Sequence, residues 1–78
     1  MNVTVYTKAD CVQCDATKRL LDRTGVSYTP VDLDTDPEAL AQLKGLGYLS
    51  APVVVTDNDS WAGFQPDKVR QLAQAVSA

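Results

Sequence analysis

Apolar and polar residues recur along this chain with two periods, one typical of strands and one typical of helices. Val3-Thr4-Val5-Tyr6 alternates as a strand does. A second strand is predicted from Val26 to Asp32, and because Pro30 cannot donate to a ladder, this strand belongs at a sheet edge. The apolar run from Pro52 to Thr56 predicts a strand buried on both faces, and Ser60-Trp61 predicts a brief fourth strand.

Helical periodicity marks three further segments. The first runs from about Val12 to Thr24, and Gly25 is placed to end it in a left-handed conformation. The second starts at Asp36-Pro37-Glu38, an N-cap followed by proline at the first helical position, and ends around residues 45–47. The third starts at Pro66-Asp67. Ala16, Leu20 and Leu21 are expected to point inward from the first helix, and the second helix carries Leu40 and Leu43. The apolar stripe of the third helix consists of Val69, Leu72, Ala73 and Val76.

The order of these elements, β-α-β-α-β-β-α, predicts the fold. A βαβ crossover makes the first two strands parallel, and the tight turn at Asp57-Asn58-Asp59 makes the last two antiparallel. We therefore expect an α/β protein with a four-stranded mixed sheet flanked by three helices, which is the pattern of a minimal thioredoxin fold. With 78 residues, we expect one domain over residues 1–78.

Cys11 and Cys14 are the only cysteines, and they fall at the head of the first predicted helix. Two thiols three positions apart on a helical turn have Cβ atoms about 5–6 Å apart, so a small adjustment closes a disulfide. A helix N-terminus favours a thiolate on Cys11; Lys8 adds positive charge, whereas Asp10 and Asp15 oppose it. The hypothesis is that Cys11 attacks a partner disulfide and Cys14 resolves the mixed disulfide.

Other readings of the two cysteines remain open at this point. They could pack as small buried hydrophobes. They could form half of a zinc or iron–sulfur site completed in a dimer, although the chain has no histidine and no third cysteine. A purely structural disulfide is disfavoured, since closing so short a loop contributes only about 2 kcal/mol in the loop-entropy model.

The amino-acid composition limits the classes of partner and the cellular compartment that we expect for this protein. The net charge is −3, and the seven Lys and Arg are scattered, which disfavours nucleic acid. No run approaches the roughly 18–20 apolar residues of a membrane span, and the N-terminus lacks the pattern of a secretory signal. We therefore expect a cytoplasmic protein, and there a CxxC beside a βαβ pattern indicates redox activity.

The chain resembles the NrdH-redoxins, small glutaredoxin-like bacterial proteins that behave functionally as thioredoxins. The resemblance spans essentially the whole chain and rests on Cys11-Val12-Gln13-Cys14, Leu46-Gly47-Tyr48, Ala51 to Val55 and Trp61 to Pro66. It implies a hydrogen donor to the large subunit of class Ib ribonucleotide reductase, recharged by NADPH-dependent thioredoxin reductase. It also implies that no cofactor is bound, since the two sulfurs carry the electrons. We expect a monomer.

Residue by residue, the resemblance implies that Cys11 attacks, Cys14 resolves and Pro52 is the cis-proline beside the dithiol. The cis bond would turn the Ala51 backbone toward an extended partner segment. Val12 and Gln13, between the cysteines, are expected to contact the partner as well.

The segment from Trp61 to Pro66 separates this chain from ordinary glutaredoxins, which have a Gly-Gly-containing segment that holds glutathione. We expect Trp61 to be partly exposed and Gly63 to permit a tight turn; Phe64 fits the core and the surface equally well. Together these three residues are expected to bind a protein partner beside the dithiol. Ala62 and Gln65 depart from the serine and arginine that the family often has. The nearest alternative function is a glutathione-dependent glutaredoxin, and the second is a dimeric metal or iron–sulfur carrier.

Overall fold

The fold has the predicted order of strands and helices. The structure is a computed structural model that describes residues 2–77. The strands are β1 (Thr4–Thr7), β2 (Thr29–Asp32), β3 (Val53–Val55) and β4 (Ser60–Ala62), and the helices are α1 (Val12–Thr24), α2 (Pro37–Gly45) and α3 (Pro66–Ser77).

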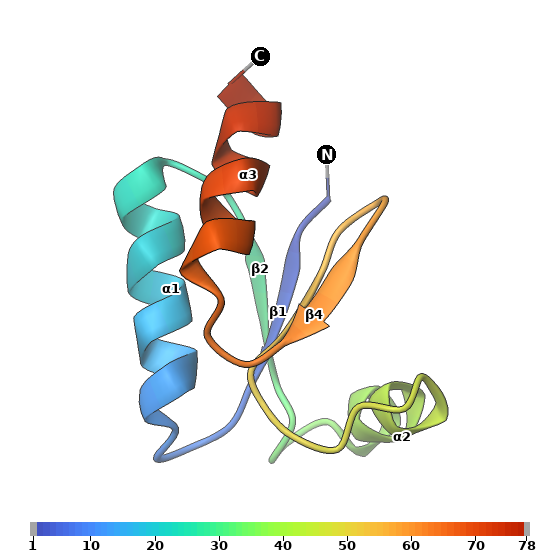
Figure 1. The fold of residues 1–78 in the computed structure, drawn as a ribbon. Helices are drawn as coiled ribbons and strands as arrows, with labels where there is room; N and C mark the ends of the chain where they lie inside the picture. The colour runs from blue at the N-terminus through green and yellow to red at the C-terminus, as the bar shows by residue number, and fades with distance from the viewer. Residues whose placement is uncertain (1, 78) are drawn as a thin grey trace.

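The four strands form one mixed sheet in the order β2-β1-β3-β4. β1 pairs parallel with β2 and antiparallel with β3, and β3 pairs antiparallel with β4. Pro30 therefore lies in an edge strand, as its missing N–H predicts. Figure 1 shows α1 and α3 side by side on one face of the sheet and α2 on the other. The predicted α/β architecture is confirmed.

The main core lies between the sheet and the α1–α3 pair. The register places Val5, Val54 and Trp61 in one row across three strands, so their side chains share a face. That face packs against buried residues of both helices. The core cluster consists of Val3, Val5, Leu21, Val26, Val54, Trp61, Val69 and Leu72.

Helix ends follow the local sequence signals. Gly25 adopts φ 79° and ends α1, with its N–H donating to carbonyls of the last turn. The Asp36 side chain accepts a hydrogen bond from the Ala39 N–H at 3.0 Å, and Pro37 follows it at the start of α2. These caps confirm the predicted boundaries of both helices.

Some local expectations were wrong. Strand β2 begins at Thr29, because Val26 donates back to the Leu21 carbonyl in the turn that closes α1. Val76 lies on the predicted stripe but is 44% exposed, since the last turn of α3 extends past the top of α1 (Figure 1). Thr17 is fully buried, which the apolar pattern did not predict; its hydroxyl donates to the Gln13 carbonyl at 2.8 Å, so burial leaves no unpaired donor.

Candidate active site

Three loops meet at the lower end of the sheet in Figure 1. They are the β1–α1 loop with Cys11, the segment before β3 with Ala51 and Pro52, and the β4–α3 loop with Gly63. The Cys11 sulfur lies 3.9 Å from the Ala51 carbonyl oxygen, and the Gly63 N–H donates to the Pro52 carbonyl at 2.8 Å. Residues far apart in sequence thus surround one sulfur pair.

The two cysteines form a disulfide with unequal environments. Their Cα atoms are 5.2 Å apart. Cys14 is fully buried, whereas Cys11 is half-buried and precedes α1 as its N-cap. The Cys14 N–H donates to the Cys11 sulfur at 3.2 Å. A helix N-terminus with a donor aimed at sulfur favours the thiolate form, so this geometry suits nucleophilic exchange at the more accessible sulfur.

Charged side chains near the dithiol are mostly exposed. Lys8 and Asp10 lie in the loop before Cys11, and Asp10 adopts a left-handed φ of 54°. The loop is held by the Ala9 N–H, which donates to the Asp34 carboxylate at 2.8 Å. Asp15 pairs with Lys18 at 3.6 Å, so part of its negative charge beside the helix start is compensated.

Pro52 lies where the resemblance implies. The Ala51–Pro52 peptide is cis, and the Pro52 side chain is fully buried next to β3. Ala51 is half-buried and presents its carbonyl oxygen to the Cys11 sulfur. The backbone of Ala51 therefore borders the dithiol.

Trp61 corrects one expectation about the partner surface. Its side chain is only 6% exposed, so the prediction of partial exposure is wrong. β4 is an edge strand, but pairing with Val54 directs the indole onto the face that α3 covers. The Lys68 ammonium lies 5.8 Å from the ring centroid, within cation–π range. Trp61 belongs to the core, and the aromatic surface near the dithiol comes from Phe64, which is 39% exposed.

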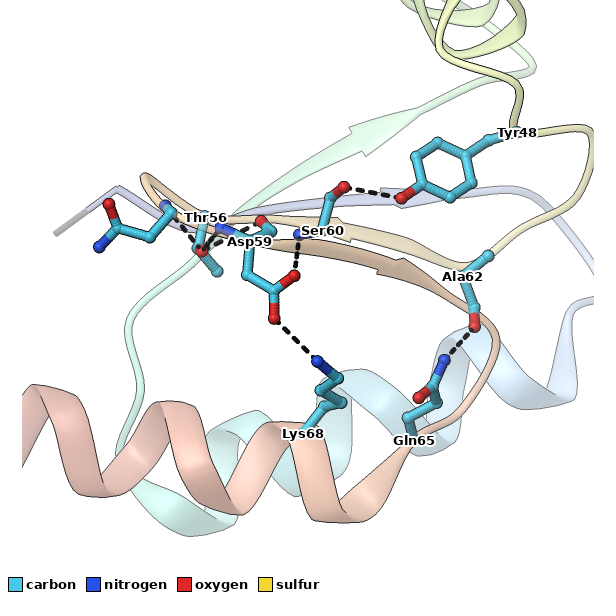
Figure 2. A network of polar contacts seen from close by, with 8 residues as sticks. Tyr48, Thr56, Asp59, Ser60, Ala62, Gln65 and Lys68 are labelled. Carbon is cyan, nitrogen blue, oxygen red and sulfur yellow. Dashed lines mark hydrogen bonds and ion pairs between the residues drawn. The ribbon is translucent and has the colours of Figure 1, made fainter.

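Gln65 anchors the β4–α3 loop despite its departure from the family pattern. Its Nε2 donates to the Ala62 carbonyl at 2.9 Å, as Figure 2 shows. In the same view, the Lys68 ammonium binds the Asp59 carboxylate at 2.9 Å. That hydrogen bond, followed by one from the Ser60 N–H, holds the pKa of Asp59 below its usual range. The loop and the start of α3 are thus tied to β4.

Exposed apolar side chains lie on the segments that meet at the dithiol, and one of them, Leu49, was not predicted from the sequence. Val12, between the cysteines, is 83% exposed, and Leu49, just before Ala51, is 86% exposed. Leu49 and Ala51 line a cavity of about 150 Å³ together with Leu40 and Lys8. The signal was available in the apolar run from Leu46 to Leu49, which no helical stripe accounts for. Exposed apolar surface of this kind marks protein contacts.

A thioredoxin-like sheet with a disulfide at the start of its first helix and a cis-proline beside it defines a thiol–disulfide oxidoreductase. The sequence profile of the glutaredoxin family matches residues 3–61. The chain belongs to this family, as a glutaredoxin-like protein of the NrdH type.

Particular relatives support this assignment. The glutaredoxin-like protein NrdH of Escherichia coli K12 is 41% identical over 78 residues, covering 100% of this chain and 96% of that protein. The NrdH protein of Lactococcus lactis MG1363 is 32% identical over 71 residues, covering 91% of this chain and 99% of that one. The solved structure of the Escherichia coli NrdH-redoxin, studied for its thioredoxin-like activity profile, superposes with a TM-score of 0.90 at 42% identity, covering 92% of this chain and 95% of the other.

Within residues 2–77, no group of three or more His, Cys, Asp or Glu side chains is placed to hold a metal ion. None of the helices in the described part of the chain is long and apolar enough to cross a membrane.

Proposed function

We propose that this redox protein donates electrons to class Ib ribonucleotide reductase and is recharged by NADPH-dependent thioredoxin reductase. The observation that carries the proposal is the half-buried Cys11, which caps α1 beside a fully buried Cys14, with exposed apolar side chains on the adjoining segments at Val12, Leu49 and Phe64. Such a surface suits a protein disulfide better than a small charged one. The thioredoxin-like activity profile of the similar Escherichia coli protein supports the same reading.

The exchange takes two steps that balance in electrons and protons. The Cys11 thiolate attacks a partner disulfide, so the partner S–S bond breaks, a mixed disulfide forms and one partner sulfur leaves to take a proton. The Cys14 thiolate then attacks the Cys11 sulfur, which releases the second partner thiol and forms the Cys11–Cys14 disulfide. The partner gains two electrons and two protons, and the reductase dithiol reverses the sequence.

The remaining parts of the proposal concern the form in which the protein acts. It works in the cytoplasm as a monomer, and it needs no bound cofactor because the two sulfurs carry the electrons. The Ala51 backbone, Val12 and Phe64 contact the partner segment around Cys11. The large subunit of the ribonucleotide reductase is the client that is reduced.

Reconstitution tests this function. Purified protein, NADPH, thioredoxin reductase and class Ib ribonucleotide reductase are mixed with no other thiol, and deoxyribonucleotide formation is measured. We expect turnover with the wild type and none with Cys11→Ser. Turnover that requires glutathione and glutathione reductase instead would establish the glutaredoxin alternative. A coloured or zinc-containing dimer after anaerobic purification would favour the carrier of a metal or cluster.

A further inference from the structure

The side chain of Gln13 joins the active-site helix to a loop 51 residues away in sequence. Its Oε1 accepts a hydrogen bond from the Phe64 N–H at 3.2 Å. Gln13 lies between the two cysteines, in the first turn of α1, and Phe64 lies between β4 and α3. This is a side-chain contact from the CxxC motif itself to the aromatic residue that stands exposed beside it.

Gln13 closes a ring of contacts around the dithiol. The Gly63 N–H donates to the Pro52 carbonyl at 2.8 Å, and the Ala51 carbonyl lies 3.9 Å from the Cys11 sulfur. The ring therefore runs from Cys11 through Gln13 to the Gly63–Phe64 backbone, and back through Pro52 and Ala51. A Cβ added to Gly63 would lie 3.5 Å from Gln13 Oε1, and Gly63 has a φ of +81°. The amide oxygen thus sits directly against the backbone of this loop.

We propose that Gln13 determines specificity for protein disulfides, by positioning Phe64 and by occupying its N–H. This inference deepens the proposed function and rests on its claim that the natural partner is a protein. Gln13 acts through the loop and takes no part in the electron transfer, so it is a positioning residue.

The first consequence concerns the protein partner. Phe64 offers an exposed aromatic side chain beside the dithiol, and its backbone is held on one side by Gln13 and, through Gly63, by Pro52 on the other. A pre-positioned aromatic anchor lowers the ordering cost of docking. Removing the acceptor on Gln13 frees the loop, so binding of the protein disulfide weakens while the chemistry at the sulfurs continues.

The second consequence concerns small anionic disulfides. A free backbone N–H beside an active sulfur pair would bind a substrate carboxylate through a charge-assisted hydrogen bond. Pro66, the first residue of α3, has no backbone N–H to offer a ligand. This makes the Phe64 N–H more important as a donor in this loop. Because Gln13 Oε1 already accepts the hydrogen bond from the Phe64 N–H, a substrate carboxylate must displace this oxygen to bind there. The side chain thereby discriminates against the charged end of a small substrate.

The variant that tests this is Gln13→Met, which removes the acceptor while keeping side-chain length. Gln74→Met, at an exposed position of α3, is the matched control. Saturating dithiothreitol recharges the protein, so neither thioredoxin reductase nor ribonucleotide reductase is needed. Initial rates are measured on insulin as the protein disulfide and on glutathione disulfide as the small anionic one, and Phe64 amide exchange is followed by NMR.

We expect Gln13→Met to raise KM for insulin with kcat held within about twofold, a split that marks lost binding only. The ratio of kcat/KM for insulin to that for glutathione disulfide should fall about tenfold, because insulin loses a pre-positioned Phe64 while glutathione disulfide gains the freed Phe64 N–H as a hydrogen-bond donor. The Phe64 amide should exchange faster. Gln13→Glu, which keeps an acceptor oxygen, should restore the insulin KM and the amide protection, and Gln74→Met should behave as the wild type.

The inference is overturned if Gln13→Met leaves the substrate ratio unchanged, lowers kcat for both substrates equally, or leaves Phe64 exchange as in the wild type. It is also overturned if Gln13→Glu behaves like Gln13→Met. A wild type that accepts no electrons from thioredoxin reductase would refute the proposed function instead, and the dithiothreitol assay would still report on Gln13.

Discussion

The backbone N–H of Cys14 donates to the sulfur of Cys11, so one cysteine caps the helix that buries the other. This asymmetry predicts different fates for the two serine variants. Cys11→Ser should lose all disulfide reduction, because the accessible nucleophile is gone. Cys14→Ser should accumulate a covalent adduct with the partner, since no resolving thiol remains.

Non-reducing electrophoresis and mass spectrometry of the adducts check this assignment. The adduct should map to Cys11 and disappear when a reductant is added. An adduct formed by Cys11→Ser through Cys14 would reverse the roles of the two sulfurs.

Exposed apolar side chains near Ala51 are predicted to contribute individually to partner binding. Leu49→Ser should raise the KM of thioredoxin reductase for this protein by about fivefold, since burying a leucine against a partner stabilises the complex by roughly 1 kcal/mol or more. Val76→Ser is the matched control, an exposed apolar residue on the last turn of α3. Neither substitution should lower the urea midpoint of unfolding appreciably. Equal KM values for the two variants would show that Leu49 does not contribute to partner binding.

Trp61 and Phe64 should respond in opposite ways to truncation. Trp61→Ala removes a core side chain, so the free energy of unfolding should fall by about 3–5 kcal/mol. Phe64→Ala removes an exposed one, so it should change stability little and raise KM for protein substrates. Urea denaturation and steady-state kinetics separate the two effects. If Trp61→Ala is as stable as the wild type but has a raised KM for protein substrates, the indole contacts the partner and does not stabilise the core.

The Lys68–Asp59 contact predicts a pH-dependent part of the stability. Because the folded-state pKa of Asp59 is lowered by Lys68, the contact stabilises the fold above the unfolded carboxyl pKa. That stability is lost as the pH falls through the lowered pKa. Lys68→Met should therefore unfold at lower urea than the wild type near neutral pH.

A pH series of urea midpoints measures the Lys68 effect. The gap between wild type and Lys68→Met should narrow in acid, where Asp59 is protonated in both proteins. Lys44→Met, at an exposed position of α2, is the control for charge removal. A gap that stays constant with pH would assign the effect to packing of Lys68 over Trp61.

Local signals in the sequence predicted the elements because their causes are local. The αL position of Gly25 and the Asp36–Pro37 helix start depend on a few neighbouring residues, and both appear where expected. The prediction that the two cysteine sulfurs can form a disulfide likewise depends only on the geometry of the first turn of α1. The prediction of a cis peptide bond before Pro52 rested on the family resemblance, because the local sequence does not distinguish a cis X-Pro bond from the usual trans form.

The errors arose where distant elements decide. An edge strand suggested exposure for Trp61, but burial depends on α3, which covers that face. The helical stripe that included Val76 gives no information on where the opposing surface ends. The contact between Gln13 and Phe64 spans 51 residues, so no local pattern could reveal it.

The central claim is that this dithiol draws electrons from a flavoprotein reductase for protein disulfides. The most direct measurement is NADPH oxidation during insulin reduction, first with thioredoxin reductase and then with glutathione and glutathione reductase. We predict efficient oxidation in the first system, dependent on Cys11, and little above background in the second. Efficient oxidation in the glutathione system alone would contradict this account.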